Sequence, residues 1–145
     1  MKHAISRQIA CDTYFKMQIP FIELLGIKDE AAIGGRSRLT LELRPELRNM
    51  YDAFHGGVIM TMLDVAMVRA AVSSRDFSFN VLTVSMSTSF LKPGIGRLVV
   101  EGRVVSSDNS LCSCEAEIVD GAGEVVAKAI GTFKFRKAMH AGEGN

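Results

Sequence analysis

A single aspartate in an otherwise apolar segment is the residue of this chain that most clearly predicts chemistry. Residues 58–72 read VIMTMLDVAMVRAAV, and Thr61, Asp64 and Arg69 are the polar positions. A helix of this composition is apolar on nearly every side and belongs at the centre of a core. Burying an ionised carboxylate is costly unless its charge is paired or used, so Asp64 is either a catalytic group or a structural residue hydrogen-bonded to a neighbouring strand.

Two glycines stand just before this segment, in the sequence His55-Gly56-Gly57. A helix that begins here leaves its first backbone N–H groups without partners, and glycine allows a substrate oxygen to approach them closely. The pattern predicts an oxyanion site at the helix start. The simpler interpretation is a hinge between a loop and a helix.

The spacing between these two features predicts the oligomeric state. Asp64 lies seven residues beyond Gly57, which is roughly 10 Å along a helix axis. One carbonyl group cannot touch both ends of that span. If both groups serve the same bond, Asp64 meets the Gly57 donor of a second chain, and the sequence predicts a two-fold dimer with paired sites.

Composition excludes several functions and supports a single cytoplasmic domain. The 145 residues have a net charge of +1, which gives no argument for nucleic-acid binding. No charge-free apolar stretch is long enough for a membrane span, and no signal peptide is recognisable. The three cysteines, Cys11, Cys112 and Cys114, lack the spacing of a zinc site, so we expect no metal and no disulfide framework.

The elements that position the candidate residues follow from periodicity and turn composition. We expect a short helix at 20–26 ending an N-terminal helical segment of about 1–26, an unstructured tail at 138–145, and a central helix from 56 to about 74. Predicted strands cover 38–43, 81–91, 98–105, 110–119 and 124–136. The order predicts an α+β domain in which an antiparallel sheet of five to six strands curls around the central helix.

Strict alternation in the strand at 81–91 predicts which side chains face the core. It places one set on the apolar face, namely Leu82, Val84, Met86 and Phe90. It places Thr83 on the opposite, polar face, together with three serines.

At this point the residues resemble a known family, the PaaI-like (phenylacetate-type) hotdog thioesterases, which are related to 4-hydroxybenzoyl-CoA thioesterase. Asn49, the His55-Gly56-Gly57 triplet and Asp64 match the family pattern N-x5-HGG-x6-D. The segments 90–96 and 124–133 resemble its later strands. The resemblance covers roughly residues 20–137 and implies the hotdog fold, a sheet wrapped around one long helix.

The resemblance also implies a mechanism and a partner. Gly57 would be the backbone donor to the thioester carbonyl, with Asn49 as its helper. Asp64 of the partner chain would activate water as a base, or act as a nucleophile. His55 would shape the loop, and Thr83 would occupy the place of a serine that holds the water. The substrate would be an acyl-CoA, no cofactor would be needed, and dimers would pair into a homotetramer.

Substrate contacts are predicted less directly. Gly56 is a candidate substrate contact at the helix start, and Met60 and Leu63 are candidates to line the acyl pocket. A further set of cations could hold the CoA phosphates: Lys92, Arg97, Lys134, Arg136 and Lys137. Two other functions stay open, a hotdog hydratase or dehydratase of acyl thioesters and a non-catalytic acyl-CoA-binding protein. The sequence does not identify the acyl group.

Overall fold

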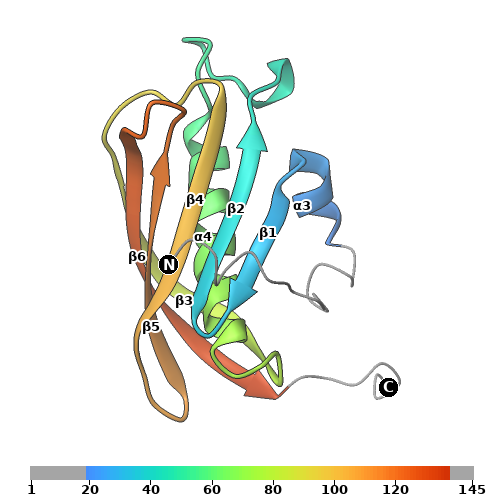
Figure 1. Ribbon diagram of the computed structural model, residues 1–145, viewed down its shortest axis with the longest axis vertical. Helices are drawn as coiled ribbons and strands as arrows, with labels where there is room; N and C mark the ends of the chain where they lie inside the picture. The colour runs from blue at the N-terminus through green and yellow to red at the C-terminus, as the bar shows by residue number, and fades with distance from the viewer. Residues whose placement is uncertain (1–18, 138–145) are drawn as a thin grey trace.

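A six-stranded antiparallel sheet curls around one long helix in the computed structural model, which describes residues 19–137 (Figure 1). The strand order is β1-β2-β4-β5-β6-β3. The elements in chain order are α3 (Pro20–Leu25), β1 (Lys28–Ile33), β2 (Arg36–Glu42), the 3-10 turn η1 (Pro45–Leu47), α4 (Gly56–Ser73), β3 (Phe79–Phe90), β4 (Arg97–Ser107), β5 (Leu111–Val119) and β6 (Val125–Lys137). The predicted α+β hotdog fold is confirmed.

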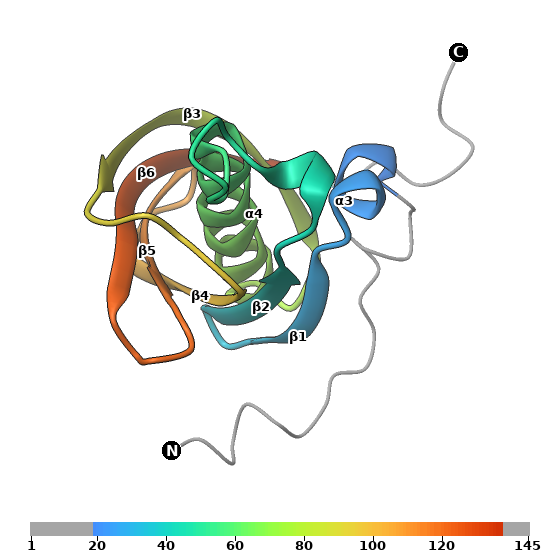
Figure 2. The ribbon, with the colours of Figure 1, turned by 90° about the horizontal axis from the view of Figure 1, so that it is seen from above.

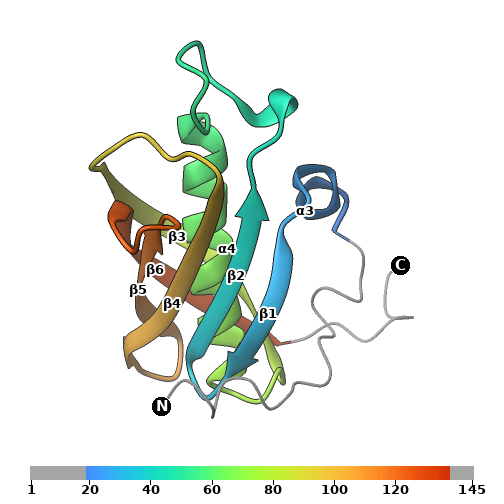
Figure 3. The same ribbon diagram turned by 45° about the horizontal axis from the view of Figure 1, so that its top comes forward.

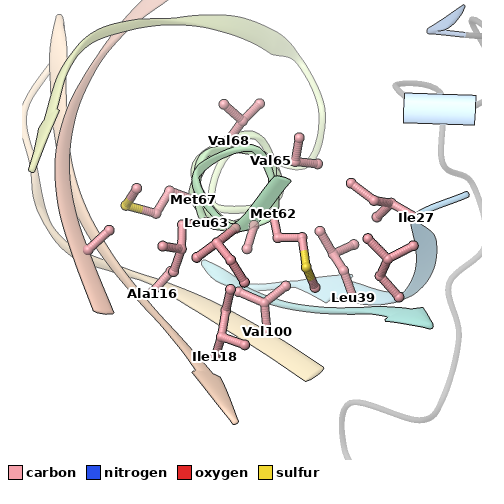
Figure 4. Packing of buried hydrophobic residues seen from close by; sticks show 14 of the residues in the cluster. Ile27, Leu39, Met62, Leu63, Val65, Met67, Val68, Val100, Ala116 and Ile118 are labelled. Carbon is pink, nitrogen blue, oxygen red and sulfur yellow. The ribbon is translucent and has the colours of Figure 1, made fainter. Parts of the chain in front are cut away.

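Helix α4 lies at the centre of the domain because it is apolar on nearly every side and can pack against the sheet that curls around it. Seen from above, the sheet surrounds it on several sides (Figure 2). Met62, Leu63 and Met67 are fully buried against the sheet (Figure 4). A side chain at Gly102 of β4 would stand 2.5 Å from the Ala66 carbonyl oxygen, so glycine there lets sheet and helix approach closely. By length and composition α4 could cross a membrane, yet 67% of it is buried inside the domain.

Strand β1 was absent from the predicted elements. Its sequence, KDEAAI, is rich in charged residues and alanine, which have low strand propensity. Tertiary contacts supply what propensity lacks. The strand pairs with β2, beside α3 (Figure 3), and its Asp29 forms an ion pair with Arg69 of α4, whose side chain is almost completely buried.

A β-bulge in β3 overturns the predicted faces of Leu82, Thr83 and Val84 and leaves those of the later residues as predicted. The pairing with β6 runs from Thr83↔Phe133 to Ser85↔Thr132, so one extra residue lies between them. Thr83 therefore shares the inner face with buried Phe133, while Leu82 and Val84 are exposed. Beyond the bulge Met86 and Phe90 return to the inner face and the serines stay outside. The bulge thus turns the Thr83 hydroxyl toward α4.

Three predictions lie outside the described residues. They are the helical segment that precedes residue 19, the state of Cys11, and the unstructured tail at 138–145.

Candidate active site

The backbone N–H groups in the first turn of α4 differ in whether they already have a hydrogen-bond acceptor. His55 is the N-cap in extended conformation, and its Nδ1 accepts the Gly57 N–H at 2.9 Å. The His55 carbonyl accepts the next two donors, from Val58 at 2.9 Å and Ile59 at 3.2 Å. Among residues 19–137 the Gly56 N–H has no acceptor. It is the one first-turn donor that remains available.

This arrangement changes the role predicted for Gly57. Its N–H is already bonded to the His55 imidazole, so it could reach a substrate only if that ring moved. A side chain at Gly57 would stand 3.1 Å from His55 Nδ1, which explains the glycine as a requirement of the cap. Gly56, predicted as a substrate contact, instead presents the free donor. A side chain there would make ordinary contact with the Phe90 ring at 3.5 Å.

His55 therefore positions the helix start. Because Nδ1 accepts a hydrogen bond, the neutral ring carries its proton on Nε2. The backbone N–H of His55 donates to the Leu47 carbonyl at 2.8 Å, which fixes the loop before the helix. The predicted loop-shaping role agrees with these bonds.

Asn49 organises the loop that delivers the helix. Its Oδ1 accepts backbone N–H groups from Tyr51 at 2.8 Å and Ala53 at 3.1 Å. Its Nδ2 makes one long bond to the Phe54 carbonyl at 3.5 Å, which leaves the second amide hydrogen for another acceptor. The loop is tied to the β3–β4 connection by the Phe54 N–H bond to Gly94 at 2.9 Å.

Asp64 is half-buried near the middle of α4 and is held by the inner face of β3. Thr83 Oγ1 donates to Asp64 Oδ1 at 2.7 Å. Burial desolvates the carboxylate and raises the pKa of Asp64, while the Thr83 hydrogen bond acts in the opposite direction. A raised pKa makes this carboxylate a stronger base than an exposed aspartate, which suits it to general-base catalysis.

The donor and the carboxylate of one chain are too far apart to act on one bond. Asp64 is eight residues beyond Gly56, roughly 12 Å along the helix. In the reaction, the backbone donor must hydrogen-bond the thioester carbonyl oxygen while the carboxylate hydrogen-bonds the water that attacks the carbonyl carbon. Both protein groups must therefore lie beside the same carbonyl.

The other residues predicted to contact the substrate lie in different environments: one is exposed, one is buried in the core and two are ion-paired. Met60 is 41% exposed on the surface of α4 and can line a substrate pocket. Leu63 is fully buried against the sheet, so it is a core residue and its predicted role is wrong. Lys92 is bonded to Asp120 and Glu124, and Arg97 to Glu30 at 3.1 Å, so neither is an uncompensated charge for a phosphate.

Two further polar groups near the site were not singled out from sequence. Thr61 Oγ1 donates to the Gly57 carbonyl at 2.9 Å. Thr88 lies on the inner face of β3, and its hydroxyl is buried without a hydrogen-bond partner among the described residues. Alternation with Met86 and Phe90 places Thr88 on the core face, and the register beyond the bulge agrees, but the sequence does not reveal that its hydroxyl is left without a partner there.

Comparisons with known proteins show which family this chain is related to. A family model described as the thioesterase superfamily matches residues 51–127. A protein of Saccharolobus solfataricus that is named as an esterase is 32% identical over 117 residues, 80% of this chain and 77% of that protein.

Two solved structures show the same fold. The PaaI protein of the E. coli phenylacetic acid degradation operon has a TM-score of 0.78 at 20% identity, covering 84% of this chain and 88% of its own. A Streptococcus mutans protein bound to acetyl CoA has a TM-score of 0.72 at 24% identity, covering 79% and 92%.

Proposed function

This chain belongs to the thioesterase superfamily, and we propose that it hydrolyses acyl-CoA thioesters to the free acid and CoA, by direct attack of water at a site shared between two subunits. Family membership supports thioester hydrolysis in general. The choice of a CoA thioester is supported by the related fold that is described as bound to acetyl CoA. The observation that carries the mechanism is the half-buried Asp64 held by Thr83, together with the free Gly56 N–H.

The reaction uses these groups in fixed order. The Gly56 N–H, helped by the free amide hydrogen of Asn49, polarises the thioester carbonyl. Asp64 removes a proton from water as the oxygen attacks the carbonyl carbon, and negative charge develops on the carbonyl oxygen. The intermediate collapses, the carbon–sulfur bond breaks, and the proton on Asp64 passes to the CoA sulfur. No step requires a metal or a cofactor.

A shared site accounts for the distance within one chain. In a two-fold dimer, Asp64 of one subunit would meet Gly56 of the partner subunit. Strand β3 is suited to this contact because it is a twelve-residue edge of the sheet. Within residues 19–137 its backbone groups have a strand neighbour on one side only, and Leu82 and Val84 are 49% and 59% exposed. Edges of this kind are normally covered, here by a second copy of the chain.

The test is hydrolysis of a panel of acyl-CoAs, phenylacetyl, benzoyl, short, medium and long chain, followed by release of free thiol. Asp64→Asn is assayed beside the native protein, and sedimentation equilibrium gives the assembly of both. We expect turnover on at least one acyl-CoA, loss of about 10² or more in the variant, and a dimer or tetramer in both cases. A monomer with full activity would contradict the shared site. Binding of acyl-CoA without hydrolysis would favour the non-catalytic alternative, and hydration of an enoyl-CoA would favour the hydratase.

A further inference from the structure

Two buried thiols face each other on the inner side of β5. Cys112 and Cys114 are two residues apart on this strand, and their Sγ atoms lie 3.6 Å apart, within hydrogen-bond distance for sulfur. Both cysteines are free and buried, whereas Leu111 and Ser113 are exposed, so alternation places the two thiols together on the core face. The proposed hydrolysis mechanism uses neither of them.

The surroundings of the two thiols give them different tendencies to ionise. A hydrogen bond from the Cys114 thiol and the positive charge of Arg75 lower the pKa of Cys112, while burial acts in the opposite direction. The same hydrogen bond and burial raise the pKa of Cys114. Arg75 is held in place because its guanidinium lies 3.7 Å from the Phe135 ring centroid and donates to the Asn109 carbonyl at 3.5 Å. Cys112 is therefore the more readily ionised sulfur, and Cys114 is its thiol partner.

The pair lies beside the β4–β5 turn, at one end of the domain (Figure 1). Cys112 is the second residue of β5. The turn before it is closed by Asp108, whose carboxylate accepts the N–H groups of Ser110 at 2.8 Å and Leu111 at 2.9 Å. The exposed end of a hairpin opens locally at a lower free energy than the centre of a sheet. A small neutral oxidant such as hydrogen peroxide can reach Cys112 through this opening.

The spacing of the two cysteines permits a disulfide after a small movement of the backbone. Two residues along a strand span about 6.6 Å, which is inside the range of Cα separations that disulfides bridge, but the commonest separation is about 5.5–6 Å. Closing the bond therefore draws β5 together by roughly 1 Å. The sheet is already irregular at this point, since the register with β4 shifts between Val104↔Cys114 and Ser106↔Ser113.

One row of the sheet joins the thiol pair to the proposed site. Cys112 pairs with Phe133 of β6, and Phe133 pairs with Thr83 of β3. Phe133 is fully buried, so it cannot move without displacing the neighbours that pack against it. Thr83 Oγ1 lies 2.7 Å from Asp64 Oδ1. A displacement of about 1 Å along this row takes that distance beyond the roughly 3.0 Å usual for a hydroxyl hydrogen bond.

We propose that Cys112 and Cys114 form a site of reversible oxidation by hydroperoxides, and that the resulting disulfide releases Asp64 from Thr83. In a protein that hydrolyses thioesters, the oxidised form is then the less active one. This consequence for activity rests on the proposed function, whereas formation of the disulfide does not.

The oxidation takes place in two steps. The Cys112 thiolate attacks one peroxide oxygen, the O–O bond breaks, and Cys112 becomes a sulfenic acid while hydroxide leaves. The Cys114 sulfur then attacks the Cys112 sulfur, the S–O bond breaks, and the oxygen leaves as water with the proton of Cys114. In total the two thiols lose two electrons and two protons, and one hydrogen peroxide becomes two waters. A thiol reductant returns the pair to its starting state.

The first test uses the Cys11→Ala protein, in which a disulfide within one chain can join only Cys112 to Cys114. After treatment with hydrogen peroxide, we expect the intact mass to fall by two hydrogen atoms and to recover with dithiothreitol. Two further substitutions separate the roles of the thiols. Cys114→Ala should stop at a sulfenic acid on Cys112 that dimedone traps, and Cys112→Ala should resist the same dose. An unchanged mass, a covalent dimer, or sulfinic acid in place of the disulfide would overturn the inference.

A second readout follows Asp64 without turnover. The pKa of its carboxyl group is measured by NMR in both redox states, with Asp64→Asn assigning the resonance. Because the Thr83 hydrogen bond lowers this pKa, oxidation should raise it, as Thr83→Val does. A disulfide that leaves the pKa of Asp64 unchanged would overturn the release from Thr83.

Activity separates this inference from the proposed function. A misplacement of about 1 Å at a reacting group can cost up to about 10²-fold, so kcat should fall at least about tenfold on oxidation and recover with dithiothreitol. Cys112→Ala should keep native kcat after the same treatment. If the protein forms the disulfide and the pKa of Asp64 rises, but no thioester is hydrolysed in either redox state, the inference stands and the hydrolase proposal fails.

Discussion

Replacing Gly56 with proline would remove one hydrogen-bond donor from the site and little else. Gly56 is the first residue of α4, a position at which proline is favoured because its ring presets the helical φ. The residue before it must be extended, and His55 already has φ −60° and ψ 138°. The Gly56 N–H has no acceptor among the described residues, so the substitution breaks no bond within them. We expect a folded dimer with unchanged thermal stability to within about 1 kcal/mol.

The expected kinetic effect is that of an oxyanion donor. Removing one such donor typically lowers kcat by roughly 10²–10³, or about 2.7–4 kcal/mol. Gly56→Ala is the control, since it keeps the N–H and places its Cβ in ordinary contact with Phe90. Steady-state hydrolysis of the best acyl-CoA should show the loss in the proline variant and near-native kcat in the alanine variant.

The same variant tests whether the site is shared. Neither Gly56→Pro nor Asp64→Asn should turn over substrate alone. Unfolding and refolding an equal mixture should restore about one quarter of native activity, because half of the dimers are mixed and each of these has one intact site. A native kcat for Gly56→Pro would refute the donor role of Gly56 and return it to Gly57, whose N–H would then have to leave His55. An inactive mixture of stable dimers would refute the shared site.

Three further predictions concern Asp64, its hydrogen bond and the β3 edge. Thr83→Val removes the hydrogen bond that favours ionised Asp64, so the acid limb of the kcat/KM pH profile should move to higher pH. Thr83→Ser keeps the hydroxyl and should leave the acid limb in place. An unchanged acid limb in the valine variant would exclude Asp64 as the base. Because burial raises the folded-state pKa of Asp64 above its ordinary 3.8, ionisation of this group opposes folding, and that penalty grows as pH rises from about 4 through the raised pKa. Asp64→Asn should therefore have a higher Tm than native protein at pH 7 and an equal Tm near pH 3, as measured by calorimetry; a lower Tm at pH 7 would show that the carboxylate stabilises the fold. Val84→Glu puts a charge on the exposed part of β3 and should yield a folded monomer with kcat reduced at least about 10²-fold, checked by sedimentation and circular dichroism, and an active monomer would contradict the dimer model.

The differences between expected and observed features have local causes. Alternation failed in β3 because the bulge between Thr83 and Ser85 shifts the register, and no glycine or proline in that strand signals it. Strand β1 escaped notice because its stability comes from pairing with β2 and from the Asp29–Arg69 ion pair rather than from its own propensity. The bulge depends on pairing with β6, and the ion pair of β1 depends on Arg69 of α4, so both features involve partners distant in sequence, whereas β2 is the adjacent strand of a hairpin.

The helix start shows the same limit at the level of single atoms. The His55-Gly56-Gly57 sequence predicted a donor site, but two adjacent N–H groups are equivalent in a sequence pattern. The conformation of His55 distinguishes them, because its ring accepts the second and leaves the first. Leu63 was misplaced for a related reason, since a helix apolar on nearly every side does not reveal which residues face the sheet.

The sequence by itself determined the architecture, the central helix and the pair of features that define the site, because these depend on periodicity, turn residues and one out-of-place carboxylate. Tertiary structure alone decided which glycine offers its N–H, that Thr83 reaches Asp64, and which cations are already ion-paired. Each of these depends on a hydrogen bond or charge pair between groups brought together by strand register, and register depends on the whole sheet rather than on any single segment.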